Sequence, residues 1–144
     1  MHRWRQARWY SWVRRYGLAE LAGTLGSYAG YYVVTLAGGG PALAAYGAAF
    51  GENIGFYGVV GGRDYSALPA PRSPAKLLRM LRNLLAEFGA AELVDFLIVR
   101  PGTTWLAVWL LGPALGVIVG KVVADAVFYT IAVTAFERLG RAAR

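Results

Sequence analysis

The tetrapeptide Gly40-Pro41-Ala42-Leu43 recurs unchanged as Gly112-Pro113-Ala114-Leu115, 72 residues further along the chain. At the same spacing, Phe56-Tyr57 recurs as Phe128-Tyr129. Each copy is long enough to cross a lipid bilayer and return, so the repeat predicts a two-helix unit that is present twice. Chance similarity between apolar helices is the competing explanation. The repeat predicts the architecture of the protein but does not identify a substrate.

Composition favours a membrane protein. Of the 144 residues, 57% are hydrophobic and only 16% are charged, whereas a soluble domain of this length needs more polar surface. A hydrocarbon core of about 30 Å takes roughly 20 helical residues per crossing. Four windows of suitable composition occur, at residues 17–37, 41–62, 84–99 and 113–136. We therefore predict an all-α polytopic membrane protein with four transmembrane helices, arranged as two parallel two-helix repeats.

The repeats divide the chain into five segments. These are a basic, aromatic interfacial segment (1–16), repeat 1 (17–65), a proline-rich cytoplasmic linker (66–80), repeat 2 (81–138) and a basic tail (139–144). Two parallel repeats enter the membrane with the same orientation, so both termini lie on one side.

Basic residues mark the cytoplasmic side. They gather before the first window, between the second and third, and after the fourth: Arg3, Arg5, Arg8, Arg14, Arg15, Arg63, Arg72, Lys76, Arg79, Arg82, Arg138, Arg141 and Arg144. The positive-inside rule then predicts a multi-pass protein of the inner membrane with both termini in the cytoplasm. Topology and anionic lipids account for the net charge of +7, so no nucleic-acid partner is needed. The absence of cysteine excludes disulfides.

The connection between the third and fourth windows is expected on the outer face. Residues 100–111 carry a single charge, and residues 100–104 are the natural place for five residues by which the second copy is longer. Trp105 and Trp109 look interfacial. The fourth helix then begins at Pro113.

Glycine spacing predicts which helices touch. Gly23, Gly26 and Gly30 face one way in the first helix, and Gly47, Gly51, Gly55 and Gly58 do so in the second. Small residues allow close backbone approach in lipid, so these two helices should pack together. Gly112, Gly116 and Gly120 form a similar run in the fourth helix, although such runs serve homodimers equally well.

Charged side chains inside the apolar windows are the candidate site. Each costs roughly 2.5–3.5 kcal/mol at the centre of a membrane helix unless it is paired or hydrated. Glu20 and Glu87 are expected to pair with Arg15 and Arg82 at the headgroups. The deeper set comprises Glu52, Asn53, Glu92, Asp95, Lys121 and Asp125.

Spacing suggests how the deeper set pairs. Lys121 and Asp125 are four residues apart and share a helix face, and we expect the helices to pair through Lys121. Asn53 aligns with Asp125 between the repeats, so the polar groups lie at positions where the two copies differ. The proline and the Phe-Tyr pair, which the copies share, are interpreted as structural scaffold. Two interpretations stay open: salt bridges that fix helix register, or a polar cavity for a substrate or ion.

Enzyme signatures are missing from the sequence. The single histidine, His2, lies in the basic N-terminal segment, which argues against a histidine metal site and a catalytic triad. There is no phosphate-binding loop of the Walker type. We expect no catalytic residues, no metal and no cofactor.

Residues 86–96 read Ala-Glu-Phe-Gly-Ala-Ala-Glu-Leu-Val-Asp-Phe, and the last window exits through Phe136-Glu137-Arg138. This pattern resembles the small four-helix GtrA-like bacterial membrane proteins, although there it lies in the first helix and here in the third. The resemblance implies movement of polyprenyl-phosphate-linked sugars, or assistance to the glycosyltransferases that use them. Residues 24–63 also resemble a short two-helix family of bacterial membrane proteins. Neither resemblance assigns site residues.

Two functions are therefore predicted as alternatives. In the first, the chain is a small transporter or flippase, of a polyprenyl-phosphate-linked or other anionic lipid-linked substrate, with the deeper polar residues as its site and Arg79 and Arg82 meeting headgroups. In the second, it is a non-catalytic subunit or scaffold of a membrane complex. Its expected partners are membrane lipids, a membrane-bound glycosyltransferase or other subunits, and a second copy of the chain.

Overall fold

A computed structural model describes residues 2–67, 73–79, 82 and 92–142. Their regular elements are helices: α1 (His2–Leu36), α2 (Pro41–Ala67), the π-helical turn η1 (Asp95–Val99) and α4 (Arg100–Ala142). Residues 74–79 and 92–94 are also helical. The predicted all-α class is confirmed. Most of the proline-rich run at 69–74, and Glu87, lie outside the described residues.

A tight turn joins α1 to α2. Gly38 adopts φ +86°, the left-handed conformation that glycine favours just past a helix end. The Gly38 and Gly39 amides donate to the carbonyls of Thr35 and Val34 at 3.0 and 2.9 Å, which satisfies the end of α1. Pro41 then begins α2, where its missing N–H leaves no hydrogen bond unmade.

The glycines of α1 and α2 meet as predicted. Gly26 faces Gly51 and Gly30 faces Gly47, so closely that a Cβ on any of them would overlap the opposite backbone. Gly55 packs in the same way on Ala22. The helices therefore touch through backbone atoms, and the side chains that fill the interface are small: Ala44, Ala45, Ala48 and Ala49 are all buried. Gly58 is not part of this contact, since nothing lies within 4 Å of its Cβ position.

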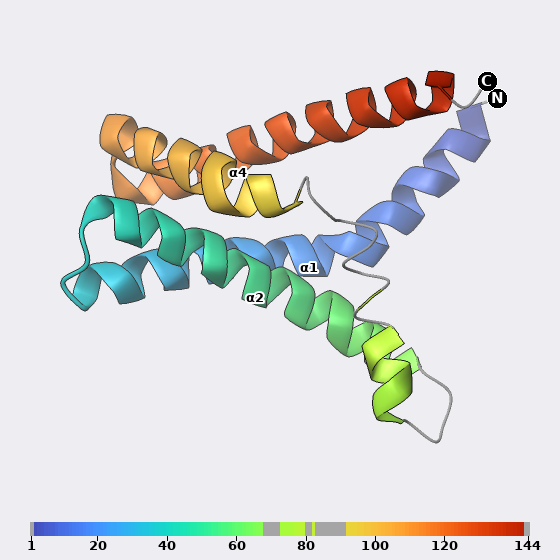
Figure 1. The fold of residues 1–144 in the computed structure, drawn as a ribbon, viewed down its shortest axis with the longest axis horizontal. Coiled ribbons are helices and arrows are strands. Elements are labelled where there is room, and N and C mark those ends of the chain that lie inside the picture. The colour runs from blue at the N-terminus through green and yellow to red at the C-terminus, as the bar shows by residue number, and fades with distance from the viewer. Residues whose placement is uncertain (1, 68–72, 80–81, 83–91, 143–144) are drawn as a thin grey trace.

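The second hairpin is contained in α4. Gly112, at φ +78° and ψ +169°, is the non-helical residue inside it, and there the chain reverses (Figure 1). We call residues 100–111, together with η1 and residues 92–94, the first arm, and residues 113–142 the second arm. Gly116 packs on Val108 and Gly120 on Thr104, as expected for antiparallel neighbours. The Gly-Pro step thus lies at a hairpin turn in both copies.

The predicted outer connection at 100–111 is wrong. These residues are helical, and Arg100, Pro101 and Thr104 are buried. Arg100 does not end the helical stretch because carboxylates neutralise it inside the bundle. The extra residues of the second copy therefore lengthen a helix and do not form a loop.

The π-helical turn η1 accommodates Pro101. Proline cannot donate the hydrogen bond that an α-helix would direct to Leu97 four residues earlier. Instead, the Arg100 amide reaches back five residues to the Asp95 carbonyl, and the Tyr46 hydroxyl of α2 donates to the Leu97 carbonyl at 2.8 Å. The widened turn is thus tied to α2 and brings Asp95 and Arg100 onto the inner face.

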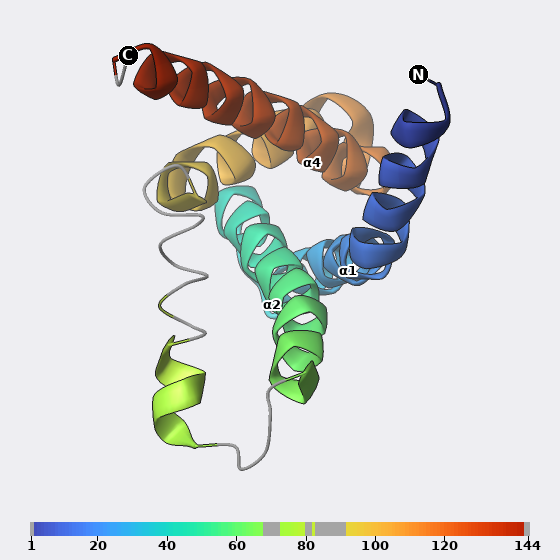
Figure 2. The same cartoon turned by 90° about the vertical axis from the view of Figure 1, so that its right-hand side faces the viewer.

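Polar side chains are concentrated in the interior of the bundle and large apolar side chains on its surface. Among the described side chains, large hydrophobic residues point outward along every helix, with Leu36, Trp109 and Ile98 67–87% exposed. The buried polar set is Ser27, Glu52, Asp95, Arg100, Thr104 and Lys121. Figure 2 shows α1 and α2 on one side of this interior and the arms of α4 on the other. A soluble domain has the opposite distribution.

One helical stretch, Glu92–Thr130, has the length and the mean hydropathy, 2.0, of a membrane span. It contains the reversal at Gly112, so its two arms run side by side. Residues 2–16, predicted as an interfacial segment, are the N-terminal part of α1.

Candidate functional site

Arg100 is the centre of a buried ion-pair network. Its side chain contacts Asp95 in two ways, from Nε at 2.8 Å and from Nη2 at 2.7 Å to the same Oδ2 atom. The guanidinium also pairs with Glu52 of α2 and, at 3.2 Å, with Asp125 of the second arm. Because Arg100 is only 8% exposed, these contacts replace its hydration.

Lys121 is the second cation of the network. Its Nζ lies 2.8 Å from Glu20 Oε2 of α1, 3.2 Å from Glu52 Oε1 and 2.7 Å from Asp125 Oδ2. The prediction that the helices pair through Lys121 is confirmed. Glu20, expected at the headgroups, instead reaches inward to this ammonium group.

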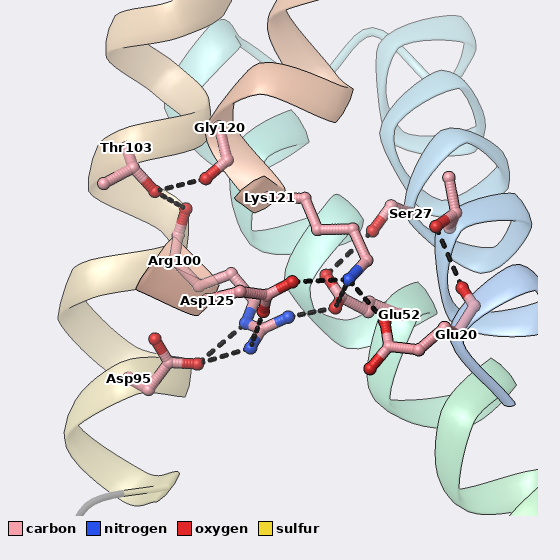
Figure 3. A network of polar contacts seen from close by, with 10 residues as sticks. Glu20, Ser27, Glu52, Asp95, Arg100, Thr103, Gly120, Lys121 and Asp125 are labelled. Carbon is pink, nitrogen blue, oxygen red and sulfur yellow. Dashed lines mark hydrogen bonds and ion pairs between the residues drawn. The ribbon is translucent and has the colours of Figure 1, made fainter. Parts of the chain in front are cut away.

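Two carboxylates are shared by both cations, which closes the network into a ring (Figure 3). Glu52 and Asp125 each contact Arg100 and Lys121. The Ser27 hydroxyl donates to Glu52 Oε2 at 3.0 Å, so both Glu52 oxygens have partners. The ring therefore connects α1, α2 and both arms of the second hairpin.

Next to the ring, a hydrogen bond from Thr103 connects the two arms. The Thr103 hydroxyl lies 3.0 Å from the Gly120 carbonyl, to which it donates, and 3.1 Å from the Arg100 carbonyl. Gly120 allows this approach because it packs on Thr104 without a side chain. The position of Lys121, one residue further, is set by this contact.

A cavity of about 80 Å³ lies beside the ring. Charged, amide and aromatic side chains from α1, α2 and both arms line it: Glu20, Glu52, Asn53, Phe56, Tyr57, Glu92, Arg100, Asp125, Phe128 and Tyr129. Both copies of the repeated Phe-Tyr pair are present, each with its rings edge to face. This pair was expected to be scaffold, but it forms the aromatic wall of the cavity. Asn53 and Asp125, which align between the copies, also meet here.

The predicted site residues fall into three groups. Glu52, Asp95, Lys121 and Asp125 are brought together in the ion-pair network, of which the spacing suggested only the Lys121–Asp125 pair. Asn53 and Glu92 line the cavity, and Glu92 hydrogen-bonds with Tyr57. Arg79 and Arg82 are exposed and do not line the cavity, so their contact with headgroups stays a prediction.

Sequence reasoning missed Arg100, Glu20 and Ser27 as members of the site. Arg100 was assigned to a connection because arginines usually mark membrane borders. A signal was present: it follows Asp95 by five residues and is flanked by apolar runs on both sides. For Ser27, a small polar residue in a glycine-rich helix, no such signal exists.

Acidic groups outnumber basic ones at the site. The ring holds four carboxylates and two cations, and Glu92 adds a fifth carboxylate at the cavity wall. The formal excess is three negative charges. Binding of a cation, or protonation of a carboxylate, would reduce this excess.

Comparison with known proteins assigns no family: no family model, curated protein or solved structure matches the chain. The resemblance to GtrA-like proteins therefore depends on residues 86–96 and 136–138 alone. Within the part of the chain that the structure describes, no group of three or more histidine, cysteine or acidic side chains is arranged to hold a metal ion.

Proposed function

We propose that this chain is a small multi-pass membrane transporter whose four spans are α1, α2 and the two arms of the second hairpin. The single observation that carries the proposal is a charged, cavity-lining interior enclosed by helices whose outer faces are apolar. Lipid is the solvent that such an outer surface matches. The proposal places the protein in the inner membrane, with both termini in the cytoplasm.

Helix packing supports the membrane setting. In lipid, apolar side chains gain little by leaving their surroundings, so helices associate through close backbone contacts and interior polar groups. Both kinds of contact occur here, as the Gly26–Gly51 and Gly30–Gly47 crossings and as the ring of ion pairs. The first arm, of about 20 residues, is roughly 30 Å long, which matches the hydrocarbon core.

The charge excess favours a transport site over a purely structural network. Salt bridges that only fix helix register are most stable when their charges cancel. Here the formal charges do not cancel, and four of the five carboxylates, Glu20, Glu52, Glu92 and Asp125, line a cavity. Ionisable groups at such a place in a membrane protein typically belong to a substrate or ion pathway.

The same excess argues against an anionic group inside the cavity. A phosphate of a polyprenyl-linked substrate, which the GtrA-like resemblance implies, would be repelled there. We therefore place any contact with anionic headgroups at the exposed basic residues Arg79 and Arg82, away from the cavity.

A scaffold role is the second candidate. Gly58, Gly61 and Gly62 lie in the C-terminal half of α2, and no atom of the described residues is within 4 Å of the Cβ position of any of them. A helix of another subunit could approach α2 closely along these positions. Under this alternative, the ring fixes the fold and the cavity is closed to water.

Cysteine labelling distinguishes the two roles, and the chain contains no cysteine of its own. A transporter predicts that Asn53→Cys, in the cavity, reacts with a membrane-impermeant thiol reagent added to either side of oriented vesicles. Val122→Cys, 60% exposed on the outer face, is the matched control and should stay unlabelled. Failure of Asn53→Cys to react from both sides would contradict transport through this cavity.

A further inference from the structure

We propose that the cavity binds a small organic monocation, of the alkylammonium or guanidinium class, with Glu92 as its counter-ion and the two Phe-Tyr pairs as its walls. The inference rests on the proposed transport function and names the class of its substrate. It is carried by the ion pairs, the cavity lining and the charge count.

Among the described residues, the ion pairs engage the other cavity-lining carboxylates, Glu20, Glu52 and Asp125, and none of them involves Glu92. Arg100 pairs with Glu52, Asp95 and Asp125, and Lys121 pairs with Glu20, Glu52 and Asp125. Glu92 faces the cavity and is held there by its hydrogen bond with the Tyr57 side chain. A bound cation would neutralise part of the remaining acidic excess.

Aromatic rings suit the body of an organic cation. Phe56, Tyr57, Phe128 and Tyr129 line the cavity together with Glu92. Ring faces attract alkylammonium and guanidinium groups by about 0.5–2 kcal/mol each, and more strongly when water is excluded. A wall made of rings and the Glu92 carboxylate therefore offers both apolar contact and charge.

A metal ion fits this cavity less well. Hard cations such as Ca²⁺ require six or more oxygen ligands, and the described residues contain no cluster of three acidic side chains with suitable geometry. Two of the carboxylates that line the cavity, those of Glu52 and Asp125, are already held by Arg100 and Lys121. A volume of about 80 Å³ favours small cations, so tetramethylammonium is a suitable probe.

Calorimetric titration of tetramethylammonium into the full chain in lipid nanodiscs tests the proposal. We expect saturable binding to the unmodified protein and at least tenfold weaker binding to Glu92→Gln, which keeps the size of the side chain and removes its charge. Tyr57→Phe keeps the ring but loses the hydroxyl, and should weaken binding a few-fold. Asp64→Asn removes a carboxylate that pairs with Arg63 away from the cavity and should bind as the unmodified protein does.

Three outcomes would overturn the inference: no binding of tetramethylammonium, equal binding by Glu92→Gln, or binding of methyl phosphate in its place. Thermal melts of each variant identify a folding defect, and Tyr57→Phe provides a second, milder test. If Asn53→Cys is labelled from both sides but tetramethylammonium does not bind, the substrate class is wrong and the transport proposal stands. If the cavity is closed on both sides, the transport proposal itself fails.

Discussion

At the residue scale, Arg100 is the side chain on which the interior depends most. It neutralises three carboxylates that come from three parts of the chain, Glu52, Asp95 and Asp125. Lysine could not replace it, because the two contacts with Asp95 use the fixed fork of a guanidinium group. Asp95 is 2% exposed, so its charge has no access to bulk water.

Arg100→Met should destabilise the protein by about 3–5 kcal/mol, because it leaves buried carboxylates without a cation. Thermal unfolding in detergent, followed by circular dichroism, measures the loss. Adding Asp95→Asn should recover part of it, since one unpaired charge is then removed. Arg79→Ala, at an exposed position, is the control and should change stability by less than about 0.5 kcal/mol. A loss in Arg100→Met as small as that of the control would contradict the network.

At the scale of elements, each hairpin depends on a feature that lets the backbone come close to a neighbour. In the first hairpin this is the set of facing glycines. In the second, Gly116 and Gly120 let the two arms pack closely, and the π-helical turn before Pro101 is tied to α2 by Tyr46. These features are local in sequence, but their partners are on other helices.

Gly51→Ala should separate α1 from α2, because its methyl group would overlap the Gly26 carbonyl. We expect a loss of about 1–3 kcal/mol, as is typical of overpacking. Gly58→Ala is the matched control on the same helix, with open space at its Cβ position. It should be neutral or stabilising by up to about 1 kcal/mol, since alanine favours helix. Similar melting temperatures for the two variants would show that the helices are not in backbone contact.

Tyr46→Phe tests the π-helical turn. The substitution leaves the Leu97 carbonyl without its donor, at a cost of about 1–3 kcal/mol. In a Pro101→Ala background the residue 101 amide can supply a donor, so the same substitution should cost less. A double-mutant cycle of unfolding free energies measures this coupling. Equal losses in the two backgrounds would mean that Tyr46 does not compensate for the proline.

At the scale of the whole molecule, the arrangement is a bundle with a charged network inside and large apolar side chains outside. Much of this could be predicted from the sequence. The Gly-Pro steps indicate where the second helix of each hairpin begins, glycine spacing indicates the α1–α2 contact, and the spacing of Lys121 and Asp125 indicates their pairing. These signals are local, so the residues that carry them are close together in the chain.

The rest could not be predicted because it depends on contacts between distant segments. In the sequence, Arg100 looks like an arginine at the membrane border, because its partners Glu52 and Asp125 are distant in the chain. Glu20 resembles a headgroup residue until Lys121, about a hundred residues away, is found 2.8 Å from it. That Phe56 and Phe128 line one cavity could not be predicted, because it depends on how the two copies pack against each other.

The central claim, that lipid surrounds the bundle and water reaches its charged interior, predicts different surroundings for neighbouring positions on one helix. Nitroxide labels on single-cysteine variants at residues 115–130, in liposomes, measure this by their collision rates with oxygen and with a water-soluble nickel chelate. The account predicts that oxygen dominates at Leu115, Ile118 and Val122, and that the nickel chelate dominates at Asp125 and Phe128. Access of the nickel chelate to Val122 equal to that at Asp125 would contradict it.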